Sequence, residues 1–121
     1  MIKVLYFDAA PKRLPEIKEK LIKSLEAQAG IDLDIIQPEE WTDNTITRVL
    51  VERLKDKDVF LVHPSYVHQA MILRYWREMI PDIKFAILTF LTKWYDEEGL
   101  KVLDYQNPDT IIDYVLEGFE K

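Results

Sequence analysis

The chain has 121 residues, of which 48% are hydrophobic and 31% are charged, and its formal net charge is −6. This composition is typical of one globular domain rather than of a disordered chain. The absence of cysteine excludes disulfides, thiolate metal sites and a cysteine nucleophile. The negative charge argues against a general nucleic-acid-binding protein, which would need a basic surface.

Two further absences bear on where the protein works. No apolar run is long enough to cross a membrane. The N-terminal residues MIKVLYFD lack the charged leader and the cleavage site of a signal peptide. Together with the lack of cysteine, these features predict a cytoplasmic protein that does not act on a membrane.

Strands and helices alternate along the first part of the chain. Residues 2–7 are a short apolar run rich in β-formers, and residues 31–36 alternate apolar and acidic side chains, so both are predicted strands. Between them, residues 15–29 place apolar side chains at intervals of four. This spacing predicts an amphipathic helix with Pro15 in its first turn and Gly30 as its stop.

The middle of the chain contains the most apolar strand. A polar break at residues 56–58 separates a second predicted helix, with N-cap candidates at residues 42–44, from the apolar run of residues 59–62. A run without polar alternation predicts a strand that is buried on both faces of a sheet. Pro64 then turns the chain into a third helix, which is predicted to end near Ile80.

The last third of the chain adds two predicted strands and a helix. Residues 83–88 are apolar and residues 100–105 have mixed polarity, and both patterns are those of strands. The last helix is predicted to begin at residues 107–109. Residues 90–99 have no clear pattern, and one or two helical turns are an open alternative there.

The alternation of strands and helices predicts a parallel sheet with right-handed crossovers, formed by one domain over residues 1–121. The three nearly apolar strands belong in the middle of the sheet, whereas residues 31–36 and 100–105 belong at its edges. The result is an α/β domain with a five-stranded parallel sheet in the order 2-1-3-4-5, the flavodoxin-like winding. Ligands of such sheets bind at the carboxyl ends of the strands, where the strand order reverses.

A few polar residues follow the predicted strands at this place. They are the candidates for binding a small ligand: Asp8, His63, Ser65, Thr89 and Asn107. A single carboxylate is a weak basis for a Mg²⁺ site, and Asp8 is also a good cap for the turn that follows it. The first loop lacks the glycines of a phosphate cradle. No metal site, cofactor or catalytic residue is therefore predicted.

Aromatic side chains are frequent toward the end of the chain. Trp94 and Tyr95 lie in the stretch without a clear pattern, and Tyr105 ends the last predicted strand. Exposed aromatic residues beside charged ones are typical of protein interfaces. These three residues are the candidates for contact with a protein partner or a second copy of the chain, with packing over the last strand as the alternative.

Several local patterns, in their order along the chain, resemble the receiver domains of two-component signalling. KVLYFDAAP resembles the first strand of that family with its acidic residues, and DVFLVHPS resembles the strand that carries the phosphoacceptor aspartate. FAILTF resembles the fourth strand with its switch threonine, and LKVLDYQNP resembles the fifth strand with its lysine and proline. The resemblance covers almost the whole chain and implies the same flavodoxin-like fold.

The chain departs from this pattern at the residues that carry the family's chemistry. Asp8 matches the first acid and Thr89 matches the switch threonine, but Ala9 stands in place of the second acid. His63 stands in place of the phosphoacceptor aspartate, and Asn107 replaces the lysine. Without these groups there is no acyl-phosphate acceptor and little to hold Mg²⁺. The resemblance therefore implies a degenerate, phosphorylation-independent receiver domain.

Two functions from different classes remain open. The first is a non-catalytic signalling or regulatory module that binds a protein partner, or forms a homodimer, through residues 90–119. In the family it resembles, that face is made by the fourth helix, the fifth strand and the last helix, and here it would include the three aromatic candidates. The second is a small enzyme or ligand-binding domain that uses the polar residues at the strand ends.

Overall fold

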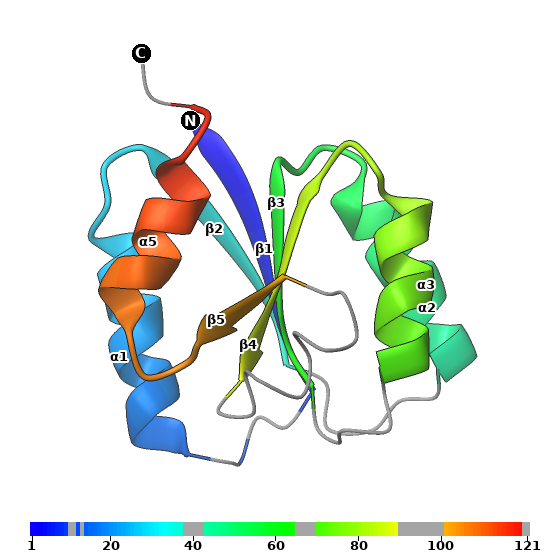
Figure 1. Cartoon of the computed structure of the whole chain (residues 1–121), viewed down its shortest axis with the longest axis horizontal. Helices are drawn as coiled ribbons and strands as arrows, with labels where there is room; N and C mark the ends of the chain where they lie inside the picture. Colours follow the sequence, from blue (N-terminus) through cyan, green and yellow to red (C-terminus); the bar gives the residue numbers. More distant parts are fainter. Residues whose placement is uncertain (10–11, 13, 38–42, 65–69, 90–100, 120–121) are drawn as a thin grey trace.

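The computed structural model describes residues 1–9, 12, 14–37, 43–64, 70–89 and 101–119. Within them the chain forms five strands and four helices (Figure 1). The strands are β1 (Ile2–Asp8), β2 (Ile31–Ile36), β3 (Val59–His63), β4 (Lys84–Thr89) and β5 (Val102–Asp104). The helices are α1 (Pro15–Glu26), α2 (Asp43–Leu54), α3 (Ala70–Met79) and α5 (Pro108–Leu116). No helix among the described residues is both long enough and apolar enough to cross a membrane.

All five strands are parallel and form one sheet in the order β2-β1-β3-β4-β5, which confirms the predicted flavodoxin-like winding. Helices α1 and α5 cover one face of the sheet, and α2 and α3 cover the other (Figure 1). The three inner strands are buried along most of their length, whereas β2 is mostly half-buried and β5 is short and mixed. Strand polarity was therefore a correct guide to strand order.

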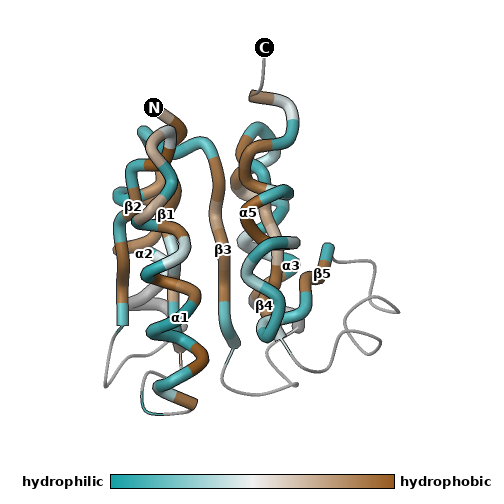
Figure 2. Tube along the Cα trace, turned by 90° about the vertical axis from the view of Figure 1, so that its left-hand side faces the viewer, coloured by the Kyte–Doolittle hydropathy of each residue, from teal (hydrophilic) through white to brown (hydrophobic). Residues whose placement is uncertain are grey.

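The sheet carries two apolar clusters, one on each face. The cluster beneath α1 and α5 includes Tyr6 and Leu61, and the cluster beneath α2 and α3 includes Phe60 and Trp76. Neighbouring residues of one strand fall into different clusters because successive side chains point to opposite faces. Figure 2 shows the apolar middle of β3 passing through the centre of the molecule. The Trp76 Nε1 group also donates a hydrogen bond to Thr47 Oγ1 at 2.9 Å, which joins α3 to α2.

Several predicted boundaries differ from the structure by one to three residues, and two of them have a clear local cause. Helix α1 ends at Glu26, three residues early, because the chain turns there toward Gly30, whose carbonyl accepts the N–H of Ile2 at 2.8 Å. Strand β5 ends at Asp104 rather than Tyr105. The Asp104 carboxylate accepts the backbone N–H of residue 106 at 2.9 Å, and this turn stops the strand.

Candidate functional site

The carboxyl ends of β1 and β3 meet where the strand order reverses. Asp8 and His63 are register partners there, and their side chains are 0% and 3% exposed. Partners in a parallel register point to the same face, which here is the face covered by α1 and α5. The winding predicted from the sequence thus correctly brings these two residues side by side.

Asp8 is held by a lysine from α1. The Lys18 Nζ atom lies 3.0 Å from each oxygen of the Asp8 carboxylate, and the Gln37 side-chain amide donates a further hydrogen bond to it at 3.3 Å. The side chain of Lys18 is only 4% exposed. Charges removed this far from water persist only when they compensate each other. The Lys18 ammonium therefore neutralises the Asp8 carboxylate from within the chain.

Lys18 was not among the residues predicted from the sequence, because only the apolar positions of this helix were assigned to its buried face. A signal was present in the spacing. Lys18 precedes Leu21 by three residues and Leu25 by seven, and both leucines are fully buried. Residues at these spacings share one helix face. A lysine on the buried face of a helix needs a buried acid, and Asp8 is that acid.

His63 is fixed by β4 and by the residue that follows β5. Its Nδ1 atom lies 2.9 Å from the Leu88 carbonyl oxygen. A carbonyl oxygen only accepts, so Nδ1 carries a hydrogen and donates it, and Nε2 is the nitrogen that can exchange a proton. The imidazole also packs edge-on against the ring of Tyr105, with the ring centroids 4.6 Å apart and the planes at 76°. The orientation of the imidazole is therefore set on two sides.

Tyr105 continues the chain of buried contacts to Tyr6, because the two hydroxyl groups hydrogen-bond to each other. Burial raises the pKa of both hydroxyls well above the ordinary value for tyrosine, and the neighbouring charge of Asp8 adds to this. Both phenols are therefore neutral at physiological pH. We call Tyr6, Asp8, Lys18, His63 and Tyr105 the buried polar cluster.

The structure places Tyr105, which was predicted to contact a protein partner, in the core. Its side chain is 1% exposed, because it packs against His63 and belongs to the core beneath α5. A side chain with so little surface cannot touch another protein directly. The other two aromatic candidates, Trp94 and Tyr95, lie outside the described residues, as does the question of helical turns in residues 90–99.

The remaining ligand-binding candidates do not join the buried polar cluster. Thr89 is buried, but it follows Leu88 in β4 and so belongs to the row of Ile87 on the opposite face of the sheet. Asn107 caps α5, because its side-chain oxygen accepts the N–H of Thr110 at 3.3 Å. An N-cap of this kind is a structural role. Ser65 lies outside the described residues.

Among the described residues at the strand ends, the polar side chains of Asp8 and His63 already have partners within the chain. Both oxygens of Asp8 are already bonded to Lys18, and the imidazole of His63 is covered by Tyr105. Among the described residues, no group of three or more histidine, aspartate or glutamate side chains is placed to hold a metal ion.

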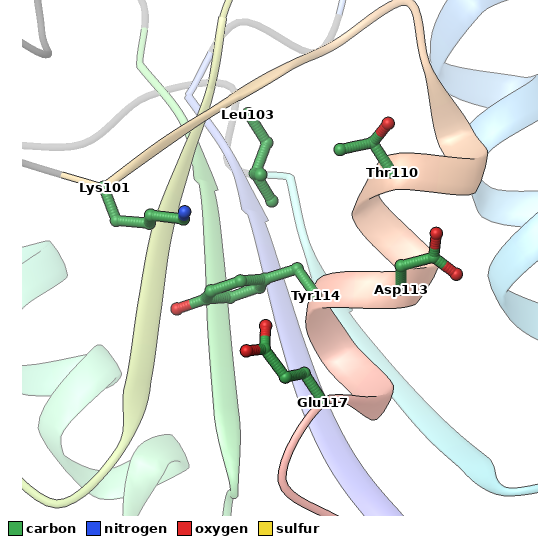
Figure 3. Close-up of a pocket in the computed structure, with 6 residues that line it drawn as sticks. All are labelled: Lys101, Leu103, Thr110, Asp113, Tyr114 and Glu117. Carbon is green, nitrogen blue, oxygen red and sulfur yellow. The ribbon is translucent and has the colours of Figure 1, made fainter.

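A separate hollow lies on the surface beside β5 and α5 (Figure 3). Its volume is about 430 Å³, and its lining residues are Lys101, Leu103, Thr110, Asp113, Tyr114 and Glu117. Figure 3 shows Lys101 and Glu117 on either side of the Tyr114 ring. The Tyr114 hydroxyl donates to the Phe85 carbonyl at 3.1 Å, and the Lys84 ammonium lies 4.2 Å from its ring centroid. These two contacts fix the position of Tyr114 in the wall of the pocket.

Comparison with known proteins identifies the fold. No protein-family model matches the chain, and no curated protein does. The chain is similar to a response regulator receiver domain protein from Clostridium thermocellum, with a TM-score of 0.61 and 17% identity over 95% of this chain and 91% of that one. It is also similar to a two component transcriptional regulator AraC from Clostridium phytofermentans ISDg, with a TM-score of 0.60 and 14% identity over the whole of both chains, 100% each.

A third similar structure is a fragment described as a putative lipoprotein from Peptoclostridium difficile 630. The TM-score is 0.65 and the identity 14%, over 96% of this chain and 95% of that one. At such identities the likeness defines the fold and leaves the activity to the residues of the site. The protein therefore has the α/β flavodoxin-like fold found in response regulator receiver domains.

Proposed function

We propose that this chain is a signalling or regulatory domain that accepts no phosphoryl group and acts by binding another protein. The observation that carries the proposal is which side chains stand at the ends of β1 and β3. At the end of β3 a buried imidazole, His63, stands where an acceptor carboxylate would be needed for an acyl phosphate. Two of the similar structures are described as a receiver domain protein and a two component regulator, which supports the regulatory class.

The state of Asp8 supports the absence of phosphoryl transfer. That reaction depends on a metal ion that neutralises the charge of the transferred group and is held by carboxylate oxygens. In this chain both oxygens of Asp8 lie 3.0 Å from the ammonium of Lys18. The carboxylate is already neutralised from within the protein, so it has little free capacity to hold Mg²⁺.

We expect no phosphorylation when the protein is incubated with acetyl phosphate and Mg²⁺. Intact-mass spectrometry should show the unmodified mass, while a phosphorylatable receiver domain in the same tube acquires a phosphoryl group. Addition of Mg²⁺ and beryllofluoride should leave the amide resonances of Asp8, His63 and Thr89 in place. A phosphoryl adduct, or saturable shifts at these residues, would contradict the proposal and favour the ligand-binding alternative.

The partner-binding part of the proposal rests on residues 90–119. The described part of this surface contains the pocket beside β5 and α5, which is lined by the buried Leu103 and by the charged Lys101, Asp113 and Glu117. Protein interfaces usually combine buried apolar side chains with polar and charged ones, as the lining of this pocket does. The rigid position of Tyr114 adds a preorganised aromatic contact, which lowers the entropy lost on binding.

We expect the chain to self-associate through this surface, with Trp94 and Tyr95 as contact residues. Analytical ultracentrifugation should show a concentration-dependent dimer, and replacing both aromatic residues by Ala should give a folded monomer. Tyr75→Ala is the matched control, because Tyr75 is an aromatic residue 52% exposed on α3, on the other side of the sheet. A dimer that survives the double substitution would contradict the proposed interface, and a wild-type monomer would leave a different protein as the partner.

A further inference from the structure

We propose that the surface pocket beside β5 and α5 binds a small zwitterion, an α-amino acid with an apolar side chain. Charges of both signs line the pocket, these charges have no ion-pair partner within the described chain, and an apolar wall lies beside them. Such a ligand needs neither a protein partner nor a phosphoryl group, so its binding can be tested apart from the signalling role.

The charged side chains of the pocket come from different elements. Lys101 precedes β5, Asp113 belongs to α5, and Glu117 follows that helix. Figure 3 shows Lys101 and Glu117 on either side of the Tyr114 ring, and the Lys101 ammonium lies 5.7 Å from the ring centroid. Within the described chain, none of these three charged side chains forms an ion pair or donates or accepts a hydrogen bond. The pocket therefore offers an ammonium and two carboxylates to a ligand.

The apolar wall of the pocket is formed by Leu103 and by the Tyr114 ring, and the ring is held in place before any ligand arrives. The Tyr114 hydroxyl donates to the Phe85 carbonyl, and the Lys84 ammonium donates to the carbonyls of Tyr114 and Glu117. A preformed wall lowers the entropy lost on binding. The volume of about 430 Å³ lies within the usual range for small-molecule sites, roughly 300 to 1,000 Å³.

These charges favour a ligand that carries both signs. A simple anion would meet the carboxylates of Asp113 and Glu117, and a simple cation would meet the ammonium of Lys101. The amino group of an amino acid is attracted to the two carboxylates, where the carboxyl end of α5 also favours a cation. Its carboxylate is attracted to Lys101, and its apolar side chain can pack against Leu103 and Tyr114.

The site can be tested by following the amide resonances of the protein during a titration with L-leucine. The resonances of Leu103, Thr110 and Tyr114 should shift saturably. N-acetyl-leucine lacks the ammonium and leucinamide lacks the carboxylate, so each should bind about tenfold more weakly than leucine at a slightly acidic pH, where the amine of leucinamide stays charged. The same titration of the variant with Trp94→Ala and Tyr95→Ala ensures that self-association does not cover the pocket.

Matched variants separate the pocket from the rest of the charged surface. Lys101→Gln with Glu117→Gln should abolish saturable binding of leucine, because it removes one charge of each sign from the pocket. Lys55→Gln with Glu78→Gln makes the same change of charge at exposed positions outside the pocket and should bind leucine as the wild type does. Three outcomes would overturn the amino-acid site: no saturable shift with leucine, equal binding of either derivative, or unchanged binding by the pocket variant. None of them would bear on phosphorylation or self-association, which are measured without leucine.

Discussion

Replacement of Lys18 by Met should lower the free energy of unfolding by about 3 to 5 kcal/mol, the usual cost of leaving one partner of a buried ion pair without the other. Met preserves most of the apolar stem of the lysine, so the loss reports the missing charge rather than a cavity. Lys18 is the ammonium bonded to both oxygens of the fully buried Asp8. Urea denaturation monitored by circular dichroism measures the effect.

Two controls separate this effect from a general loss of helix stability. Lys23→Met removes a lysine from the same helix that is 74% exposed and pairs with Glu19 at the surface, and it should change stability little. The double variant Asp8→Asn with Lys18→Met should recover part of the loss, because no charge is then left buried without a partner. A loss as small for Lys18→Met as for Lys23→Met would contradict the buried pair.

The hydrogen bond between Tyr6 and Tyr105 predicts a strongly non-additive pair of substitutions. Tyr6→Phe and Tyr105→Phe should each cost about 1 to 3 kcal/mol, because each leaves the other buried hydroxyl without this partner. The double substitution should cost clearly less than the sum of the single ones. Urea denaturation of the four proteins gives the coupling. Tyr75→Phe, at an exposed position, should be nearly neutral, and simple additivity would show that the two hydroxyls do not interact.

The same pair of tyrosines predicts that the free energy of unfolding decreases at alkaline pH. Burial raises the pKa of both hydroxyls, so the folded protein keeps these protons while the unfolded chain releases them near the ordinary value of about 10. The contribution of the pair is therefore complete below that pH and is lost as the pH rises above it. Stability measured for the wild type should fall in this range more steeply than for the double Phe variant.

The order of the strands could be predicted from the polarity of their sequences. The site could not be predicted in this way, because polarity alone does not show which of its side chains are buried. Strand order was predictable because, in a sheet with helices on both faces, strands of mixed polarity fit only at the edges. The meeting of Asp8 and His63 was predictable from the winding alone. Lys18 was missed because lysine is rarely buried, and only its spacing from two leucines indicated otherwise.

The misjudgement of Tyr105 has a similar physical origin. It follows an edge strand of mixed polarity, which suggested an exposed position. Tyr105 is two residues after Leu103, however, and side chains two apart in extended backbone share a face, so both enter the same core cluster. The same alternation separates Thr89 from His63, because His63 lies on the face beneath α5 and Thr89 on the other. Side-chain parity, applied to each strand end, would have placed both residues on the correct face of the sheet.

The pairing of Asp8 with Lys18 also changes what the solution around the protein can control. A divalent ion bound at a carboxylate has an occupancy that depends on its concentration and falls when a chelator is added. Lys18 is attached to the same chain, so its local concentration at Asp8 is fixed by the fold. The pairing of Asp8 with Lys18 therefore does not depend on the concentration of a diffusing ion.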